Sequence, residues 1–268
     1  MSGPRHKNRP QIMAILNVTP DSFSDGGAFN EVNAAVTQAK RCVEEGADII
    51  DIGAESTRPG AKPVSAEEEL ARVLPVLSAL QNELTKPISI DTYKAQVAKA
   101  AIENGASIIN DVWGLQRDKQ MADVAAETDA QVIIMHNRFD GANENIDILN
   151  DMDRWFDTSL ALAKKSGIRD ENITLDPGIG FGKTFKQNLI VLAHLKRLKN
   201  HGYPVLMGLS RKRFIGAILN VEADQRLFGT LSANLSSIMD GVDAIRVHDV
   251  KPHREAIDIW MAIDAERT

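Results

Sequence analysis

Eight short apolar runs recur along the chain, and nearly every one ends in a polar residue that can take part in chemistry. The runs span 12–16, 49–52, 88–90, 108–109, 132–135, 173–175, 205–209 and 244–247. Segments of helical pattern separate them, at 31–45, 66–84, 94–104, 118–127, 151–166, 185–200, 227–240 and 252–265. Strands that alternate with helices indicate βαβ units and a parallel sheet.

Eight such units in 268 residues predict a single-domain (β/α)8 barrel of the α/β class. We expect a flexible N-terminal segment over 1–10 and the barrel over 11–268. The alternative is an open doubly wound sheet. An open sheet places its site at one switch point, whereas here polar residues end most of the runs, which favours closure.

Three segments rich in Gly, Pro, Asp, Asn or Ser are expected to be long loops at the carboxyl ends of the strands. They span 19–30, 54–65 and 136–150. Long loops in a compact domain commonly form lids or binding surfaces. A functional site is therefore expected at that end of the barrel.

Composition narrows the functional classes. The net charge is −6, which argues against general nucleic-acid binding. Cys42 is the single cysteine, so no internal disulfide can form, and a reducing, cytoplasmic location is expected. No apolar run approaches the length of a membrane helix, and residues 1–10 lack the apolar core of a signal peptide.

Basic residues gather at the ends of the last two strands, where such barrels often bind phosphate. Ser210-Arg211-Lys212 follows the seventh run, and Arg246 and His248 share one face of the eighth because they are two residues apart. Arg58 adds a cation after the second run. The arginine fork matches phosphate geometry. The alternative is a solvated basic rim, which would not explain clustering at strand ends in an acidic protein.

Carboxylates and amides end three other runs. Asp91, Asn110 and Asp176 would be partly buried at the barrel mouth, where acids need partners. A flat heterocycle with a guanidine-like edge could supply them. The alternatives are that these residues cap helices or pair with Lys212. Asn17 offers a neutral oxygen to Mg²⁺, which takes one or two protein oxygens beside phosphate and water, or it is a turn residue.

Some patterns point elsewhere and fail on inspection. The segment 178–184 looks like a phosphate loop, but Pro177 stands where a Walker A motif requires glycine. A turn that lets the chain approach a ligand is the better interpretation. His248 and His253 lack the partners of a zinc site, and Ser56 and Ser210 lack a recognisable His–acid pair for covalent catalysis.

Several motifs together resemble the dihydropteroate synthase family over residues 12–253. They are Asn17-Val18-Thr19-Pro20-Asp21-Ser22-Phe23, Asp51-Ile52-Gly53-Ala54-Glu55-Ser56-Thr57-Arg58-Pro59-Gly60, Ile109-Asn110-Asp111-Val112, 176–184, Ser210-Arg211-Lys212 and Arg246-Val247-His248-Asp249. The resemblance implies a (β/α)8 barrel that condenses 6-hydroxymethyl-7,8-dihydropterin pyrophosphate with p-aminobenzoate. It also implies Mg²⁺ as cofactor, a homodimer and an enzyme of the kind that sulfonamides target.

The resemblance also implies roles for individual residues. The pterin would contact Asp91, Asn110, Val112, Met135, Asp176, Phe181, Gly208 and Lys212. The pyrophosphate would contact Asn17, Arg58, Arg246 and His248, with Mg²⁺ at Asn17, and p-aminobenzoate would contact Phe23, Thr57, Pro59 and Ser210. The residues expected to act in catalysis are Arg58, Asp91, Lys212, Arg246 and His248.

Two departures from the family pattern stand out. Gly53-Ala54 replaces the pair of glycines that members commonly carry, and the segment 136–141 lacks the run that many members have after the fifth strand. Two alternatives to the synthase remain: a pterin-binding methyltransferase domain on the same barrel, and a paralogue that binds pterin without condensing it. For the synthase we expect an SN1-like course, because an electron-rich dihydropterin can share positive charge left on carbon.

Overall fold

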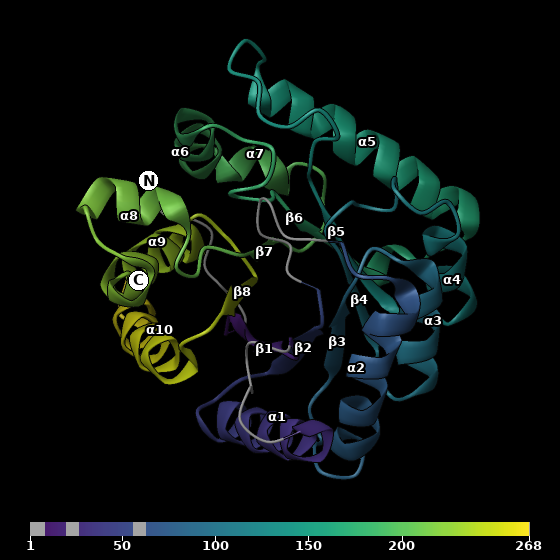
Figure 1. Ribbon diagram of the computed structural model, residues 1–268. Coiled ribbons are helices and arrows are strands. Elements are labelled where there is room, and N and C mark those ends of the chain that lie inside the picture. Colours follow the sequence, from purple (N-terminus) through teal and green to yellow (C-terminus); the bar gives the residue numbers. More distant parts are fainter. Residues whose placement is uncertain (1–8, 20–26, 56–62, 268) are drawn as a thin grey trace.

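The strands form one parallel barrel. The computed structural model describes residues 9–19, 27–55 and 63–267, and Figure 1 shows the strands as an inner ring and the helices as an outer ring. The strands are β1 (Gln11–Asn17), β2 (Ile49–Gly53), β3 (Ile88–Asp91), β4 (Ile108–Asp111), β5 (Gln131–Met135), β6 (Ile173–Asp176), β7 (Leu206–Met207) and β8 (Ala244–Val247). Their order is β6-β5-β4-β3-β2-β1-β8-β7, and a parallel bridge between Leu175 and Val205 joins the two ends. The predicted single-domain (β/α)8 barrel is confirmed.

The helices follow the strands as expected, with two differences. They are α1 (Gly27–Glu44), α2 (Ala66–Leu80), α3 (Ala95–Glu103), α4 (Met121–Glu127), α5 (Ile148–Ser166), α6 (Phe185–Ala193), α7 (Leu195–Lys199), α8 (Arg213–Leu219), α9 (Leu227–Met239) and α10 (Val250–Ala265). The helix predicted over 185–200 is interrupted at His194, whose backbone leaves the helical region. Helix α8 was not predicted, because its seven residues are too few to show a period.

Two of the expected loops are shorter than predicted. Helix α5 already begins at Ile148, because the Asp147 side chain caps it by accepting hydrogen bonds from Leu149 N (3.1 Å) and Asn150 N (3.2 Å). Helix α1 begins at Gly27, inside the segment predicted as loop. The expected flexible segment over 1–10 lies almost wholly outside the described residues.

The alternation along the strands decides which side chains face the barrel interior. A small apolar cluster fills the interior floor, formed by Met13, Ile49, Ile108, Ile133, Leu206 and Ala244. The larger core packs between the strands and the helices. Side chains two residues further along a strand point to the same face. The layer above the floor therefore carries Asp51, Asn110, Met135, Gly208 and Arg246.

This alternation also corrects one expectation. His136 ends the fifth run but does not contribute to the mouth, because it follows the inward-facing Met135 and so points to the helix side. It is fully buried there, 3.3 Å from Asp151 Oδ2. Asp111 likewise follows Asn110 and accepts hydrogen bonds from Trp113 N (2.8 Å) and Leu115 N (2.7 Å).

Candidate active site

Three acidic or basic side chains meet in the inner layer of the mouth. Arg246 on β8 donates from Nη2 to Asp91 Oδ2 and from Nε to Asp51 Oδ2, both at 2.6 Å. Asn110 Nδ2 donates to the same Asp51 oxygen at 3.2 Å. Four strands thus contribute to one hydrogen-bonded cluster.

This cluster leaves polar atoms without partners. Oδ1 of Asp51 and Oδ1 of Asp91 are buried and accept no hydrogen bond from the part of the chain that the structure describes. Nη1 of Arg246 likewise donates no hydrogen bond within the described residues, while the side chain stays 22% exposed. Burial raises the pKa of Asp91 to about 7, against the opposing charge of Arg246. Buried acceptors of this kind call for N–H donors from a ligand.

A second group lies across the mouth on β6 and on the segments after β6 and β7. Asp176 Oδ1 accepts a hydrogen bond from Gly178 N at 2.7 Å. Its Oδ2 lies 3.8 Å from where a Cβ on Gly208 would stand, so the glycine leaves space beside the carboxylate. Lys212 Nζ lies 4.3 Å from the centre of the Phe181 ring. Acid, cation and aromatic ring are thus arranged around one space.

Electrostatics joins the two groups into one site. Burial lowers the pKa of Lys212 to about 8, while the charges of Asp176 and Asp91 raise it and that of Arg246 lowers it further. Burial raises the pKa of Asp176, and the charges of Lys212 and Arg246 counteract this rise. Charges influence one another in this way when they lie near each other. The structure therefore brings Asp91, Asp176, Lys212 and Arg246 around a single mouth.

Ser210 and His248 form a pair at the end of β7 and β8. Ser210 Oγ accepts a hydrogen bond from His248 N at 3.1 Å and lies 2.9 Å from His248 Nδ1. In the neutral tautomer that leaves Nδ1 without a proton, the Ser210 hydroxyl donates its one proton to Nδ1. The ring proton then lies on Nε2, where it can serve as a donor to an anion.

Arg211 does not join the basic groups expected there. Its Nε and Nη2 donate to the Asp249 carboxylate at 3.1 and 2.6 Å, and its backbone has a φ of 55°. The Arg211 guanidinium is therefore already engaged by Asp249. Of the Ser210-Arg211-Lys212 motif, the structure brings Ser210 to His248 and Lys212 to the Phe181 ring.

Val112 and Met135 differ from the other buried apolar residues. Both are buried, but neither belongs to the barrel floor or to the larger core. Met135 pairs with Asp176 in the register of β5 and β6, and its Cγ lies 3.3 Å from where a Cβ on Gly178 would stand. The position of Met135 suits it to line the wall of a flat ligand site beside Asp176.

The residues present suit a magnesium ion held only partly by the protein. Asn17 ends β1, and its side chain is exposed. Among the described residues, there is no group of three or more His, Cys, Asp or Glu side chains that could hold a metal. Mg²⁺ keeps several waters and takes phosphate oxygens beside one or two protein oxygens, so a single carboxamide fits that mode of binding.

Four of the expected site residues cannot be placed. Phe23, Thr57, Arg58 and Pro59 lie outside the described residues. The segment 54–65 is described only at its ends, where Ala54 O accepts a hydrogen bond from Arg72 Nη1 at 2.7 Å. The roles expected for these four residues stay predictions.

Sequence reasoning missed two residues of this region. Asp51 begins one of the family motifs but was assigned no role, yet it binds Arg246 and Asn110. Asp51 lies two residues after Ile49 and therefore faces the barrel interior, so the period of two along the strand could have identified it. Lys183 lies in the segment 178–184 that we expected to be a turn and was assigned no role, although it is buried and hydrogen-bonded. The sequence around Lys183, with Gly182 before it and the start of α6 after it, does not indicate that the lysine is buried.

Comparisons with known proteins identify the family of this chain. Residues 13–248 match the family model described as pterin binding enzyme. A dihydropteroate synthase from Clostridium beijerinckii is 51% identical over 251 residues, covering 92% of each chain. The structure resembles that of a dihydropteroate synthase from Clostridium difficile in the presence of pteroic acid, with a TM-score of 0.92, 52% identity, and coverage of 95% of this chain and 97% of that one.

A third comparison involves an inhibitor complex. The dihydropteroate synthase of Yersinia pestis with a sulfonamide drug complex has a TM-score of 0.89 and 42% identity, covering 96% of this chain and 95% of that one. The family model spans most of the barrel, and the relatives match over nearly their full length. The chain therefore belongs to the pterin-binding enzymes and, within them, to the dihydropteroate synthases, which are transferases.

Proposed function

We propose that this protein joins 6-hydroxymethyl-7,8-dihydropterin pyrophosphate to p-aminobenzoate and releases 7,8-dihydropteroate and pyrophosphate. One observation carries the proposal. Arg246 binds Asp91 at 2.6 Å in a mouth where Asp91 Oδ1 is buried without a partner in the described part of the chain. Arg246, which can bind an anion, is therefore in contact with Asp91, which can accept a hydrogen bond from a ring N–H.

The pterin half is recognised by complementary hydrogen bonding. Its 2-aminopyrimidinone edge presents adjacent N–H donors, which suit the carboxylates of Asp91 and Asp176. Lys212 supplies a donor for ring acceptor atoms, and Phe181 and Met135 lie where they can cover the faces of the ring. The Asn110 carboxamide, held by Asp51, adds a directional contact.

The pyrophosphate is the leaving group. We infer that Arg246 Nη1, the Nε2 proton of His248 and the guanidinium of Arg58 stabilise the charge that develops on it. The C–O bond to the pterin methylene breaks first in an SN1-like course, and its electron pair leaves with pyrophosphate. The amine of p-aminobenzoate then forms the C–N bond with its lone pair and loses one proton. An aromatic amine is neutral at pH 7, so it needs no base before attack.

Magnesium assistance belongs to the same proposal. Asn17 would hold Mg²⁺ together with pyrophosphate oxygens and water, and the ion would supply positive charge beside the departing oxygens. The chain's own residues orient the two substrates. Ser210, with Phe23, Thr57 and Pro59, would surround p-aminobenzoate, the position that a sulfonamide would occupy as a competitor.

We further propose a cytoplasmic homodimer. Apolar side chains of α8 and α9 are strongly exposed: Ile218 by 56%, Leu219 by 48%, Phe228 by 80% and Met239 by 50%. Exposed apolar side chains on two helices that contact each other suit a second copy of the chain. None of the helices in the described part of the chain has the length and apolar composition of a membrane-spanning segment. A single cysteine suits a reducing compartment.

A product assay tests the proposal. Pterin pyrophosphate, p-aminobenzoate and Mg²⁺ are incubated with the protein, and 7,8-dihydropteroate and pyrophosphate are measured by chromatography. Equal amounts of both products, and inhibition by a sulfonamide that p-aminobenzoate relieves, are expected. Pterin binding without either product would favour the non-condensing paralogue. Methyl transfer from a methylated folate in place of condensation would favour the methyltransferase domain.

A further inference from the structure

A buried polar network lies behind the pterin side of the mouth and takes no part in the proposed chemistry. It consists of Lys183, His136 and Asp151, on the segment before α6, at the end of β5 and on α5. His136 is 0% exposed and Lys183 is 8% exposed. A charged group that is buried in a protein is normally paired with polar groups. The hydrogen-bond partners of Lys183 therefore indicate which part of the structure it stabilises.

Lys183 uses all three of its N–H donors. Its Nζ lies 2.9 Å from Gly178 O, 3.2 Å from Phe181 O and 2.6 Å from His136 Nδ1. Because Lys183 donates to Nδ1, the imidazole is neutral and carries its proton on Nε2, which faces Asp151 Oδ2 at 3.3 Å. Burial, and then the charge of Lys183, lower the pKa of His136 to about 4, in agreement with a neutral ring.

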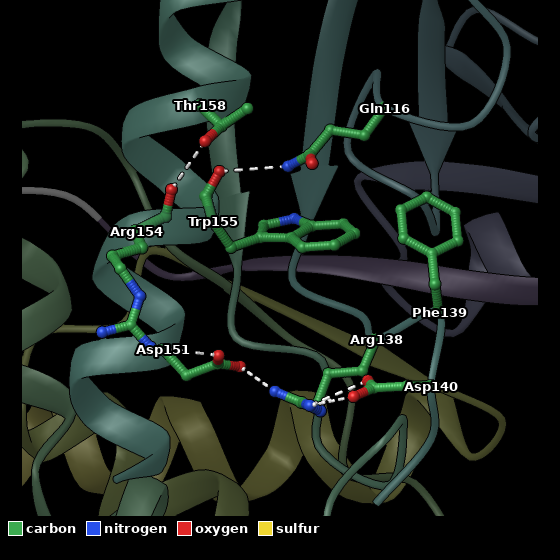
Figure 2. A pocket seen from close by; sticks show the side chains of 8 residues that line it. All are labelled: Gln116, Arg138, Phe139, Asp140, Asp151, Arg154, Trp155 and Thr158. Carbon is green, nitrogen blue, oxygen red and sulfur yellow. Dashed lines mark hydrogen bonds and ion pairs between the residues drawn. The ribbon is translucent and has the colours of Figure 1, made fainter. Parts of the chain in front are cut away.

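The outer end of the network is fixed at the surface. Arg138 Nη1 donates to Asp151 Oδ2 at 2.6 Å, and its Nη2 binds both oxygens of Asp140 at 2.7 Å. Figure 2 shows Arg138 between these two acids at the edge of a cavity that Trp155 and Phe139 also line. The unusual segment after β5 therefore anchors Asp151, and through it the His136 ring.

The inner end of the network reaches the proposed pterin site. The two carbonyls bound by Lys183 begin and end the turn 178–181. Gly178 N binds Asp176 Oδ1 at 2.7 Å, and His136 N binds Asp176 O at 2.9 Å. The Phe181 ring lies beneath Lys212 Nζ. One turn therefore orients both the carboxylate and the aromatic ring of that site.

We propose that Lys183 is a positioning residue for pterin recognition. Its Nζ holds the turn 178–181 closed against His136 and thereby sets where Phe181 and Asp176 stand relative to Lys212. Lys183 contacts backbone carbonyls and an imidazole, so it acts through these residues and not on the substrate. The inference rests on the proposed function, because it assigns the turn to the pterin half of the substrate.

The test compares Lys183→Met with Lys186→Met, an exposed lysine three residues further along α6. Binding of 6-hydroxymethylpterin is measured by calorimetry. Displacing a positioned group weakens binding without removing any contact residue, so a roughly ten- to hundredfold higher Kd is expected for Lys183→Met. The binding stoichiometry and the KM for p-aminobenzoate at saturating pterin pyrophosphate stay as in wild type. Lys186→Met behaves as wild type.

Other outcomes separate the two proposals. A Lys183→Met protein that binds pterin with wild-type Kd overturns the inference, and so does one whose stoichiometry falls while its Kd stays unchanged. A wild-type protein that binds no pterin overturns the proposed function, and the inference with it.

A second pair of variants covers a Lys183→Met protein that does not fold. Asn188 Oδ1 holds the same turn from the other side by accepting a hydrogen bond from Gly180 N at 2.7 Å. Asn188→Ala should also raise the pterin Kd, and adding Phe181→Ala should then cost much less than it does in the wild-type background. Fully additive losses in this cycle would overturn the proposal.

Discussion

Asp91 and Arg246 are 155 residues apart in the chain, yet Oδ2 of one lies 2.6 Å from Nη2 of the other. The contact depends on the parallel order β3-β2-β1-β8, which brings the two strands to the same side of the barrel. It leaves Asp91 Oδ1 and Arg246 Nη1 for ligands. The predictions below test the separate functions of this mouth.

The first prediction concerns the carboxylate on β6. Asp176→Asn should lower kcat/KM, and the decrease should correspond to a loss of roughly 2–4 kcal/mol of transition-state stabilisation. The reason is that the amide lacks the negative charge that favours a cationic ring. Steady-state turnover measures this loss. Asp157→Asn, at an exposed position on α5, is the matched control and should be unchanged. Near-normal turnover of Asp176→Asn would contradict its role in pterin binding.

The second prediction separates the leaving group from the ring. Arg246→Lys keeps a positive charge beside Asp51 and Asp91 but loses the planar fork. We expect its affinity for pterin pyrophosphate to fall by about tenfold more than its affinity for free pterin, a difference of about 1.4 kcal/mol. Calorimetry with both ligands measures the difference. Equal losses would refute the assignment of Arg246 to pyrophosphate.

The third prediction concerns pH. Burial raises the pKa of Asp91 to about 7, and burial lowers the pKa of Lys212 to about 8. Pterin binding requires the carboxylate and the ammonium, so affinity should rise as pH increases through about 7 and fall as pH increases beyond about 8. Calorimetric titrations at several pH values trace both limbs. Asp91→Asn should abolish the acidic limb, and Lys212→Met the alkaline one.

The same raised pKa affects stability. Between its ordinary pKa of 3.8 and about 7, Asp91 holds a proton in the folded protein but not in the unfolded chain. The free energy of unfolding attributable to Asp91 therefore decreases as pH increases through that interval. Denaturant titrations at several pH values should show a shallower pH dependence for Asp91→Asn. An unchanged slope would show that Asp91 is already ionised throughout.

The fourth prediction concerns the turn 178–181. Gly178 has a φ of 64°, and an added Cβ would stand 1.9 Å from His136 O. Gly167 has a φ of 90° with nothing within 4 Å of such a Cβ, so Gly167→Ala reports the backbone cost alone. We expect Gly167→Ala to cost about 1 kcal/mol and Gly178→Ala at least about 2 kcal/mol more. Chemical denaturation measures the free energy of unfolding of both variants. Equal costs would show that the turn 178–181 shifts to accommodate the added Cβ.

The fifth prediction concerns magnesium. Removal of Mg²⁺ with a chelator should abolish product formation while leaving the Kd of free pterin unchanged, because the ion is proposed to accompany the pyrophosphate. Asn17→Ala should raise the Mg²⁺ concentration needed for half-maximal turnover by roughly tenfold, or about 1.4 kcal/mol. Product formation that continues in the presence of the chelator, with no Mg²⁺ added back, would contradict this assignment.

The amino-acid sequence by itself determined the barrel and predicted several of the residues at its mouth. Apolar runs at regular intervals fix eight strands, and a period of two along each strand fixes which residues face inward. Arg246, Asp176 and Asn110 could therefore be assigned to one surface without coordinates. Helix α8 and the break at His194 could not be predicted, because both depend on local backbone geometry over only a few residues.

Only the tertiary structure decided which charges meet. The runs themselves do not show which partners Asp51 and His136 bind: Asp51 binds Arg246, and His136 lies 3.3 Å from Asp151 on α5. Burial and partner choice depend on contacts between segments far apart in the chain, and hydrogen-bond energies change sharply over tenths of an ångström. The pairing of Arg246 with two carboxylates and the three bonds of Lys183 are consequences of barrel closure and of the packing of β5 against α5.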